Sequence, residues 1–220
     1  MKGLLIFGVT SLARLAHYYA VNDLGLNVLA FVVDEAYKSE DKFLSLPVLT
    51  WEQACRIYFT DEAFFFVAIG YKNMRLRSVN YARIKSAGYE LVNIISRTSF
   101  VANDVIKGDN NIIMSGVVVE SGVVMGSNNV VWSNTTVCHD CIIGSHNFIA
   151  ANVTIGGEVS IGDQNFFGFS STVLQQIVIG DETLIGAQTL ITKNTNPLCE
   201  YRGSPAKKIA LIDADKGVMV

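Results

Sequence analysis

In blocks of six, residues 101–196 read VANDVI KGDNNI IMSGVV VESGVV MGSNNV VWSNTT VCHDCI IGSHNF IAANVT IGGEVS IGDQNF FGFSST VLQQIV IGDETL IGAQTL ITKNTN. These 16 blocks follow one another without insertion or deletion, and 15 of them begin with an apolar residue. The second residue is Gly or Ala in ten blocks, and the fifth never carries a charge. Because a period of six fits neither an α-helix nor a single strand, each block is predicted to be one short strand and one corner of a solenoid.

Three blocks make one predicted coil of 18 residues. The apolar first residues are expected to form a ladder inside the solenoid, and the small second residues to permit tight corners. Lys107 and Glu120, both in early coils, are exceptions to the charge pattern. The other charged side chains lie at the third or fourth position of a block, which is expected to face outward: Asp104, Asp109, Asp140, Glu158, Asp163, Asp181, Glu182 and Lys193.

Composition bounds the class of protein. The chain has 220 residues, half of them apolar, and a formal net charge of −3, which suits one large or two small domains and gives no basic surface for nucleic acid. Its longest apolar run, Ala63 to Ile69, is too short to span a membrane. The four cysteines are too few and too scattered for a disulfide framework, so a cytoplasmic protein is expected.

Residues 1–96 alternate between apolar runs and helical patterns. Strands are predicted at Gly3–Phe7, Asn27–Val33, Phe64–Ile69 and Tyr89–Ile95, and helices at Leu12–Asp23, Trp51–Tyr58 and Asn73–Ala87. This order predicts a small parallel sheet with helices on both faces, which is a Rossmann-like α/β domain. The expected domains are therefore residues 1–96, for nucleotide binding, and residues 97–220, for the solenoid and its tail.

Ligands of such sheets bind outside the carboxyl ends of the strands, so Gly8, Ser11, Asp34 and Gly70 are expected to line one crevice. Backbone N–H groups at the start of the first helix favour an anion such as phosphate. Only the first glycine of a dinucleotide fingerprint is present, since Thr10 and Ser11 stand where further glycines would lie. A small α/β domain without any ligand is the alternative.

The segment Val137–Cys141 carries the most reactive side chains of the solenoid. Its Cys-x-x-Cys spacing suggests zinc, but Cys141 falls at an inward fifth position and Cys138 at a small second position, so both are interpreted as packing residues and no metal is expected. His139 falls at an outward third position beside Asp140, where a carboxylate could support proton transfer. Gly157 is expected to stack beside His139 one coil later. The alternative for His139 is a solvated corner residue.

Two segments carry a family resemblance. The tail Gly203-Ser204-Pro205-Ala206-Lys207 resembles the Gly-x-Pro-Ala-Lys exit of hexapeptide acyltransferases, and His139-Asp140-Cys141-x-Ile143-Gly144 resembles the catalytic turn of bacterial sugar acetyltransferases. Over residues 1–208 the chain resembles two-domain nucleotide-sugar N-acetyltransferases of the bacillosamine, perosamine and viosamine type, which are related to sialic acid O-acetyltransferases. The resemblance implies that the solenoid is a left-handed parallel β-helix.

The resemblance also implies roles for residues. His139 would be the general base with Asp140 as its partner, and Gly157 would contact the acetyl thioester. The protein would be a homotrimer that holds acetyl-CoA between neighbouring β-helices, and apolar Met114, Trp132 and Leu174 are expected to need cover. A second histidine of some relatives is replaced here by Phe148. Further expected contacts are Lys193, Arg202 and Lys207 to the cofactor, and Asp34 and Glu35 beside the nucleotide base and ribose.

The expected reaction is acetyl transfer from acetyl-CoA to the 4-amino group of a dTDP-, UDP- or GDP-linked 4-amino-4,6-dideoxy sugar, for O-antigen or glycan biosynthesis. Sugar O-acetylation is the nearest alternative. A non-catalytic solenoid that senses a nucleotide is a second. A metal-dependent hydratase on the same β-helix needs three histidine ligands, and of His17, His139 and His146 the first lies in the other predicted domain.

Overall fold

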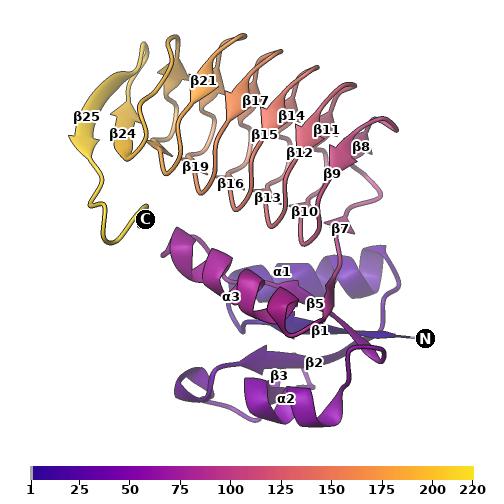
Figure 1. Cartoon of the computed structure of the whole chain (residues 1–220). Coiled ribbons are helices and arrows are strands. Elements are labelled where there is room, and N and C mark those ends of the chain that lie inside the picture. Colours follow the sequence, from indigo (N-terminus) through magenta and orange to yellow (C-terminus); the bar gives the residue numbers. More distant parts are fainter. Residues whose placement is uncertain (1) are drawn as a thin grey trace. The chain divides into compact units, whose positions relative to one another are not determined.

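The computed structural model describes residues 2–220, which divide into two compact units (Figure 1). The first unit contains residues 2–70 and 76–94, and the second contains residues 71–75 and 95–220. Each unit has its own apolar core. No helix within residues 2–220 is both long enough and apolar enough to cross a membrane.

The first unit is built on one six-stranded sheet of order β3-β4-β2-β1-β5-β6. All neighbours pair in parallel except β3 and β4. The strands are β1 (Gly3–Phe7), β2 (Val28–Val33), β3 (Lys42–Phe43), β4 (Leu46–Thr50), β5 (Ala63–Val67) and β6 (Glu90–Leu91). The helical elements are α1 (Ser11–Tyr18), η1 (Tyr19–Asp23), η2 (Glu35–Tyr37), α2 (Trp51–Ile57) and α3 (Met74–Ser86).

Helices cover both faces of this sheet, as the sequence predicts. Ala54 of α2 and Ile84 of α3 share one core cluster with Leu5 and Phe65. Side chains alternate between the two faces of a strand, so Phe31 points away from Ala30 and Val32 of that cluster. The ring of His17 in α1 lies 5.7 Å from the ring of Phe31, which places α1 on the opposite face.

A hairpin that the sequence did not predict follows β2. No strand is predicted between Val33 and Trp51, whereas the structure pairs β3 with β4 in antiparallel register. Leu44 and Ser45 turn the chain with left-handed φ angles of 48° and 67°, a turn for which neither residue is a typical signal. Further along the chain, the predicted strand Tyr89–Ile95 is two short strands, β6 and β7 (Ile94–Ile95).

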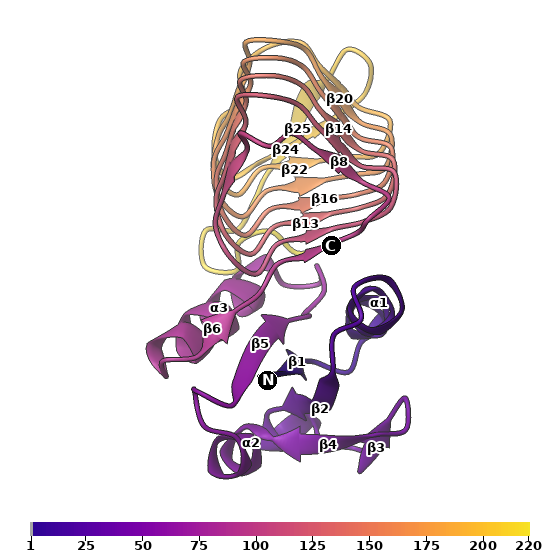
Figure 2. The ribbon, with the colours of Figure 1, turned by 90° about the vertical axis from the view of Figure 1, so that its right-hand side faces the viewer.

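The second unit is a left-handed parallel β-helix, as the family resemblance implies. Figure 1 shows its coils stacked side by side, and Figure 2 shows them nearly end-on. Strands 18 residues apart pair in parallel, such as Val118 with Thr136 and Thr136 with Thr154. Three sheets result, with orders β25-β24-β22-β19-β16-β13-β10-β7, β23-β20-β17-β14-β11-β8 and β21-β18-β15-β12-β9.

The strands of the β-helix are two residues long until the last two, which form an antiparallel pair. They are β8 (Phe100–Val101), β9 (Ile106–Lys107), β10 (Ile112–Ile113), β11 (Val118–Val119), β12 (Val124–Met125), β13 (Val130–Val131), β14 (Thr136–Val137), β15 (Ile142–Ile143), β16 (Phe148–Ile149), β17 (Thr154–Ile155), β18 (Ser160–Ile161), β19 (Phe166–Phe167), β20 (Thr172–Val173), β21 (Val178–Ile179), β22 (Leu184–Ile185), β23 (Leu190–Ile191), β24 (Cys199–Arg202) and β25 (Lys207–Leu211).

The predicted interior ladder is confirmed. From Ile113 to Ile191, every first residue of a block is buried and belongs to one core cluster. Every fifth residue is also buried, including Asn129, Asn147 and Asn165. Their side-chain oxygens accept backbone N–H bonds from the next coil at 2.7–2.8 Å, so buried amides continue the hydrogen bonding between coils.

The reason for glycine at the second position differs from the prediction. The left-handed backbone of the corners lies at the fourth position, as in Asn128, Asp140 and Glu158. Second-position glycines are instead required by close approach between coils. A Cβ on Gly144 would lie 2.7 Å from the carbonyl oxygen of Gly162, and one on Gly156 would lie 2.6 Å from the backbone nitrogen of Gln175.

Candidate active site

His139 lies on the corner that connects β14 with β15. Because one coil has 18 residues, Gly157 and Lys193 follow it in the same column of the stack. Neighbouring parallel strands are about 4.8 Å apart, so Lys193 lies about 14 Å from His139 along the axis, three coils further on. The predicted catalytic pair and two predicted cofactor contacts therefore share one corner of the β-helix.

The imidazole of His139 is held by its neighbour. Its Nδ1 lies 2.9 Å from Oδ2 of Asp140, and both side chains are exposed. The hydrogen bond with Asp140, more than any other interaction, raises the pKa of His139 above its ordinary value. If Asp140 accepts the Nδ1 proton, Nε2 is the nitrogen left to accept a proton from a substrate.

Gly157 leaves open space beside Nε2. A Cβ built on Gly157 would lie 2.6 Å from Nε2 and 2.7 Å from Cε1 of His139. Within residues 2–220 the Gly157 N–H has no hydrogen-bond partner, although the Gly157 carbonyl accepts a bond from the N–H of Gln176. A basic nitrogen and a free N–H donor thus lie together at an accessible corner.

Two further carboxylates flank His139, and the sequence did not predict a role for either. Oε2 of Glu120 accepts the backbone N–H of His139 at 2.8 Å, from the preceding coil. The charges of Glu120 and Glu158 also raise the pKa of His139, after the contribution of Asp140. Glu120 breaks the charge pattern of the repeat because it occupies a second position. That departure was a usable signal in the sequence.

Of the two cysteines of this segment, Cys141 packs inside the coil and Cys138 is half-buried. Cys141 is fully buried, and its Sγ lies 3.1 Å from the carbonyl oxygen of Gly156, to which it donates. Burial raises the pKa of Cys141 to about 11, so its thiol stays protonated. Within residues 2–220 no group of three or more His, Cys, Asp or Glu side chains could hold a metal ion.

Arg202 and Lys207 lie apart from His139 within one chain. They face each other in the β24–β25 pair, and the Arg202 side chain pairs with Oε1 of Glu200 at 2.5 Å. A Cβ on Gly186 would lie 2.8 Å from Cγ of Arg202, so Arg202 lies over the corner that follows β22. His139 lies on the next corner of the coil, after β14.

Phe148 belongs to an aromatic cluster. Its ring stacks on Phe166 at 5.5 Å and 14°, and the ring of Tyr71 lies 4.7 Å from it. Trp132 packs at 6.1 Å. The prediction that Met114 faces outward and needs cover is wrong, because Met114 is only 1% exposed. Leu174 is exposed, as predicted.

In the first unit, the predicted phosphate end lies after β1. Gly8 has a left-handed φ of 122°, and a Cβ there would lie 2.9 Å from the carbonyl oxygen of Ala68. Thr10 donates from its hydroxyl to the same oxygen at 3.2 Å. Ser11 is exposed at the first residue of α1, and Gly70 follows β5 with no atom within 4 Å of a Cβ position. The loops after β1 and β5 thus meet at the carboxyl ends.

Asp34 follows β2, and Glu35 starts η2. The carboxylate of Asp34 pairs with Nη1 of Arg83 at 2.7 Å. The guanidinium of Arg83 lies over the rings of Phe7 and Trp51, at 5.1 and 4.8 Å from their centroids. Asp34 is therefore fixed at the strand end by an arginine that the sequence analysis did not include.

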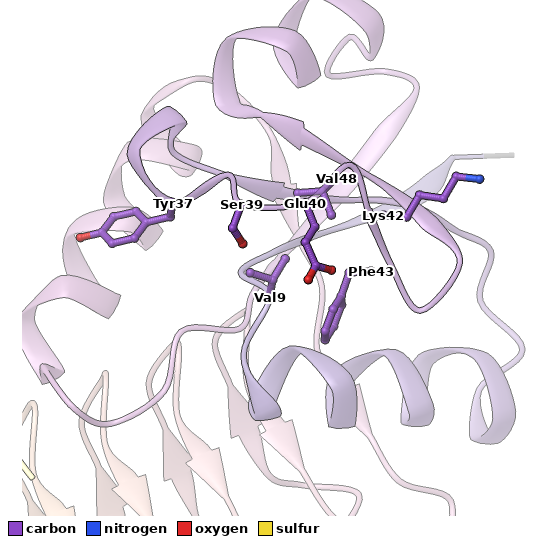
Figure 3. Close-up of a pocket in the computed structure, with 7 residues that line it drawn as sticks. All are labelled: Val9, Tyr37, Ser39, Glu40, Lys42, Phe43 and Val48. Carbon is purple, nitrogen blue, oxygen red and sulfur yellow. The ribbon is translucent and has the colours of Figure 1, made fainter.

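A cavity of about 160 Å³ opens beside these strand ends (Figure 3). It lies between the residue after Gly8 and the β3–β4 hairpin. Its lining is Val9, Tyr37, Ser39, Glu40, Lys42, Phe43 and Val48. Pockets for drug-sized ligands usually measure about 300–1,000 Å³, so this one suits a single ring system.

The repeat and the two units define a two-domain hexapeptide-repeat protein, as the sequence resemblance predicted. Residues 122–157 match the family of the bacterial transferase hexapeptide (six repeats). The matched segment contains His139, Asp140 and Gly157. Comparison with curated protein sequences gives no match.

Solved structures extend the likeness to nearly the whole chain. PerB from Caulobacter crescentus, in complex with CoA and GDP-perosamine, is 25% identical with a TM-score of 0.86, and the alignment covers 96% of this chain and 98% of PerB. The acetyltransferase domain of PglB from Neisseria gonorrhoeae is 21% identical, with a TM-score of 0.86 and coverage of 95% and 100%. WeeI from Acinetobacter baumannii is 17% identical, with a TM-score of 0.85 and the same coverage. At these identities, the PglB domain and WeeI show a similarity of fold alone.

Proposed function

We propose that this chain transfers an acetyl group from acetyl-CoA to the 4-amino group of a nucleotide-linked 4-amino-4,6-dideoxy sugar. The observation that supports this proposal best is the free Gly157 N–H beside Nε2 of His139, whose imidazole is oriented by Asp140. PerB, solved with CoA and GDP-perosamine, supports this substrate class. Residues 1–96 would hold the sugar nucleotide, and residues 97–220 would bind acetyl-CoA and catalyse the transfer.

In this reaction the sugar nitrogen attacks the thioester carbonyl carbon, and the bond from carbon to sulfur breaks to release CoA. Nε2 of His139 takes the proton that the nitrogen loses. The Gly157 N–H contacts the acetyl thioester and stabilises the oxygen that becomes negative during the attack. Asp140 keeps the imidazole in one orientation and stabilises its protonated form.

The carboxylates around His139 favour an amine over a hydroxyl as the acceptor. A sugar amine is largely an ammonium ion near neutral pH, so the negative charge of Glu120, Asp140 and Glu158 favours its binding at this corner, and it gives one proton to solvent before the neutral nitrogen attacks. A neutral hydroxyl group gains much less from that field. The proposal is therefore N-acetylation.

A homotrimer is part of the proposal. The sheet that begins after the His139 corner carries exposed Ile106, Val124 and Ile142 in register on three successive coils, and Val178 follows beyond Ser160. Contiguous exposed apolar surface of this kind marks an interface. A neighbouring β-helix packed there would lie beside His139 and could bring its own Arg202 and Lys207 to a shared acetyl-CoA site, together with Lys193. The reaction would take place in the cytoplasm and supply O-antigen or other glycan assembly.

The test is release of CoA from acetyl-CoA with GDP-, UDP- and dTDP-linked 4-amino sugars, each beside its 4-hydroxy counterpart. One amino sugar should be acetylated at nitrogen, and His139→Ala should lower kcat by roughly 10²- to 10⁴-fold with little change in thermal stability. Ser121→Ala, one coil earlier in the same column, is the matched control and should keep wild-type turnover. CoA release with 4-hydroxy sugars alone would establish O-acetylation, and no release with any acceptor would refute acetyl transfer.

A further inference from the structure

The lining of the cavity of the first unit includes the polar side chains of Tyr37, Ser39, Glu40 and Lys42. Within residues 2–220 no hydrogen bond or ion pair engages the carboxylate of Glu40, although neighbouring acids are paired. Asp34 pairs with Arg83, and Asp41 pairs with Lys38 at 3.2 Å. Figure 3 shows the Glu40 carboxylate directed toward Val9 and Phe43, whereas the ammonium of Lys42 points away.

The apolar part of the lining is Val9, Phe43 and Val48. The ring of Phe43 packs edge-on against Phe31 at 4.8 Å, and the guanidinium of Arg14 lies 5.1 Å from its centroid. Val48 is buried. An aromatic ring with aliphatic neighbours suits the flat face of a nucleobase.

The position fits the base of a nucleotide. The loop after β2 carries Asp34 and then the cavity residues, and acids at the end of the second strand contact the ribose in doubly wound α/β folds. The phosphates would then lie toward the first residues of α1, near Ser11. The base would point from the ribose into the cavity.

A carboxylate at the position of Glu40 can discriminate among bases. An ionised carboxylate offers only acceptors and can accept two parallel hydrogen bonds. Guanine presents two adjacent donors on one edge, N1–H and the 2-amino group. Uracil and thymine present a single N3–H between two carbonyl oxygens, which a carboxylate would repel. The Ser39 hydroxyl, which also points into the cavity in Figure 3, can donate to a carbonyl oxygen such as guanine O6.

We propose that this cavity is a guanine pocket and that Glu40 is its specificity-determining residue, so that the acceptor sugar is linked to GDP. The proposal rests on the proposed function for the sugar and the acetyl transfer. The pocket itself is defined by GDP binding, which requires no catalysis.

The experiment is calorimetric titration of the full chain with GDP, UDP, dTDP and inosine diphosphate, which lacks the 2-amino group. GDP should bind more tightly than the other three. Glu40→Gln should weaken GDP binding by about 5- to 150-fold, the range for loss of a bidentate base contact, and should bring the GDP and inosine diphosphate affinities together. Asp41→Asn removes the same charge one residue away from the cavity and should change the Kd less than about twofold.

Tighter binding of UDP or dTDP, or an unchanged ratio of GDP to inosine diphosphate affinity in Glu40→Gln, would overturn the guanine assignment. CoA release is measured with the same preparations. Turnover of a UDP- or dTDP-linked amino sugar would refute the guanine pocket while supporting acetyl transfer. Preference for GDP without CoA release from any acceptor would support the pocket and refute the proposed reaction.

Discussion

Substitution of Gly157 by Ala tests the space beside His139. The added methyl group would lie 2.6 Å from Nε2, and ordinary contact begins at 3.4 Å, so the imidazole must move by about 0.8 Å. Gly157 does not have a left-handed φ angle, so alanine fits the backbone there without strain. His139 is exposed and can swing away at little cost in stability. A displacement of about 1 Å at a reacting group can cost about 10²-fold in rate.

We therefore expect Gly157→Ala to lower kcat about 10²-fold with little change in Tm. Steady-state CoA release and thermal unfolding measure the two quantities. Gly156→Ala is the contrasting neighbour, because its methyl group would meet the backbone of Leu174 and Gln175 at 2.6–3.0 Å, where neither coil can yield easily. That variant should lose stability.

A double substitution separates an effect through His139 from any other. In His139→Ala the space beside residue 157 is empty, so adding Gly157→Ala should cost less than about threefold more. The backbone N–H of residue 157 is present in all these variants. Wild-type kcat in Gly157→Ala, or losses that multiply in the double variant, would refute the reasoning.

Two other predictions concern charge and assembly. Asp140 raises the pKa of His139, and a general base acts in its deprotonated form. Asp140→Asn should therefore move the acid limb of the kcat/KM profile to lower pH and also lower the rate. An acid limb at unchanged pH would show that another group titrates. Ile142 is 58% exposed in the apolar column beside the His139 corner. Ile142→Glu should give a smaller species in sedimentation and lose activity, with Thr154→Glu on another sheet as the control. An active species of unchanged size would contradict an interface there.

The sequence placed His139 at a corner of the solenoid through the register of the repeat. Once residues 101–196 are divided into blocks of six, His139 and Asp140 must lie at a corner, Cys141 must lie inside, and Gly157 must follow one coil later. Fixed register makes this reasoning local, since a coil contacts only its neighbours. The same register predicted that Cys141 is a packing residue. In the structure its thiol is buried and donates to a backbone carbonyl oxygen.

Other parts of the site depended on contacts that no period encodes. The pairing of Asp34 with Arg83 joins residues 49 positions apart, and the hairpin of Leu44 and Ser45 carries no turn signal. Glu40 therefore gave no sign of lining a cavity. Arg202 and Lys207 were predicted beside the cofactor, and only the folded tail shows that they lie on a different corner from His139.

The sequence by itself thus determined the β-helix, its inward ladder and the corner of His139, because an 18-residue coil converts position in the chain directly into position in space. Tertiary structure alone decided why second-position glycines are needed and what surrounds the strand ends of the first unit. Close approach between coils excludes a Cβ at Gly144 and Gly156. In the α/β unit, neighbouring loops come from distant parts of the chain, and their contacts follow from packing of the whole sheet.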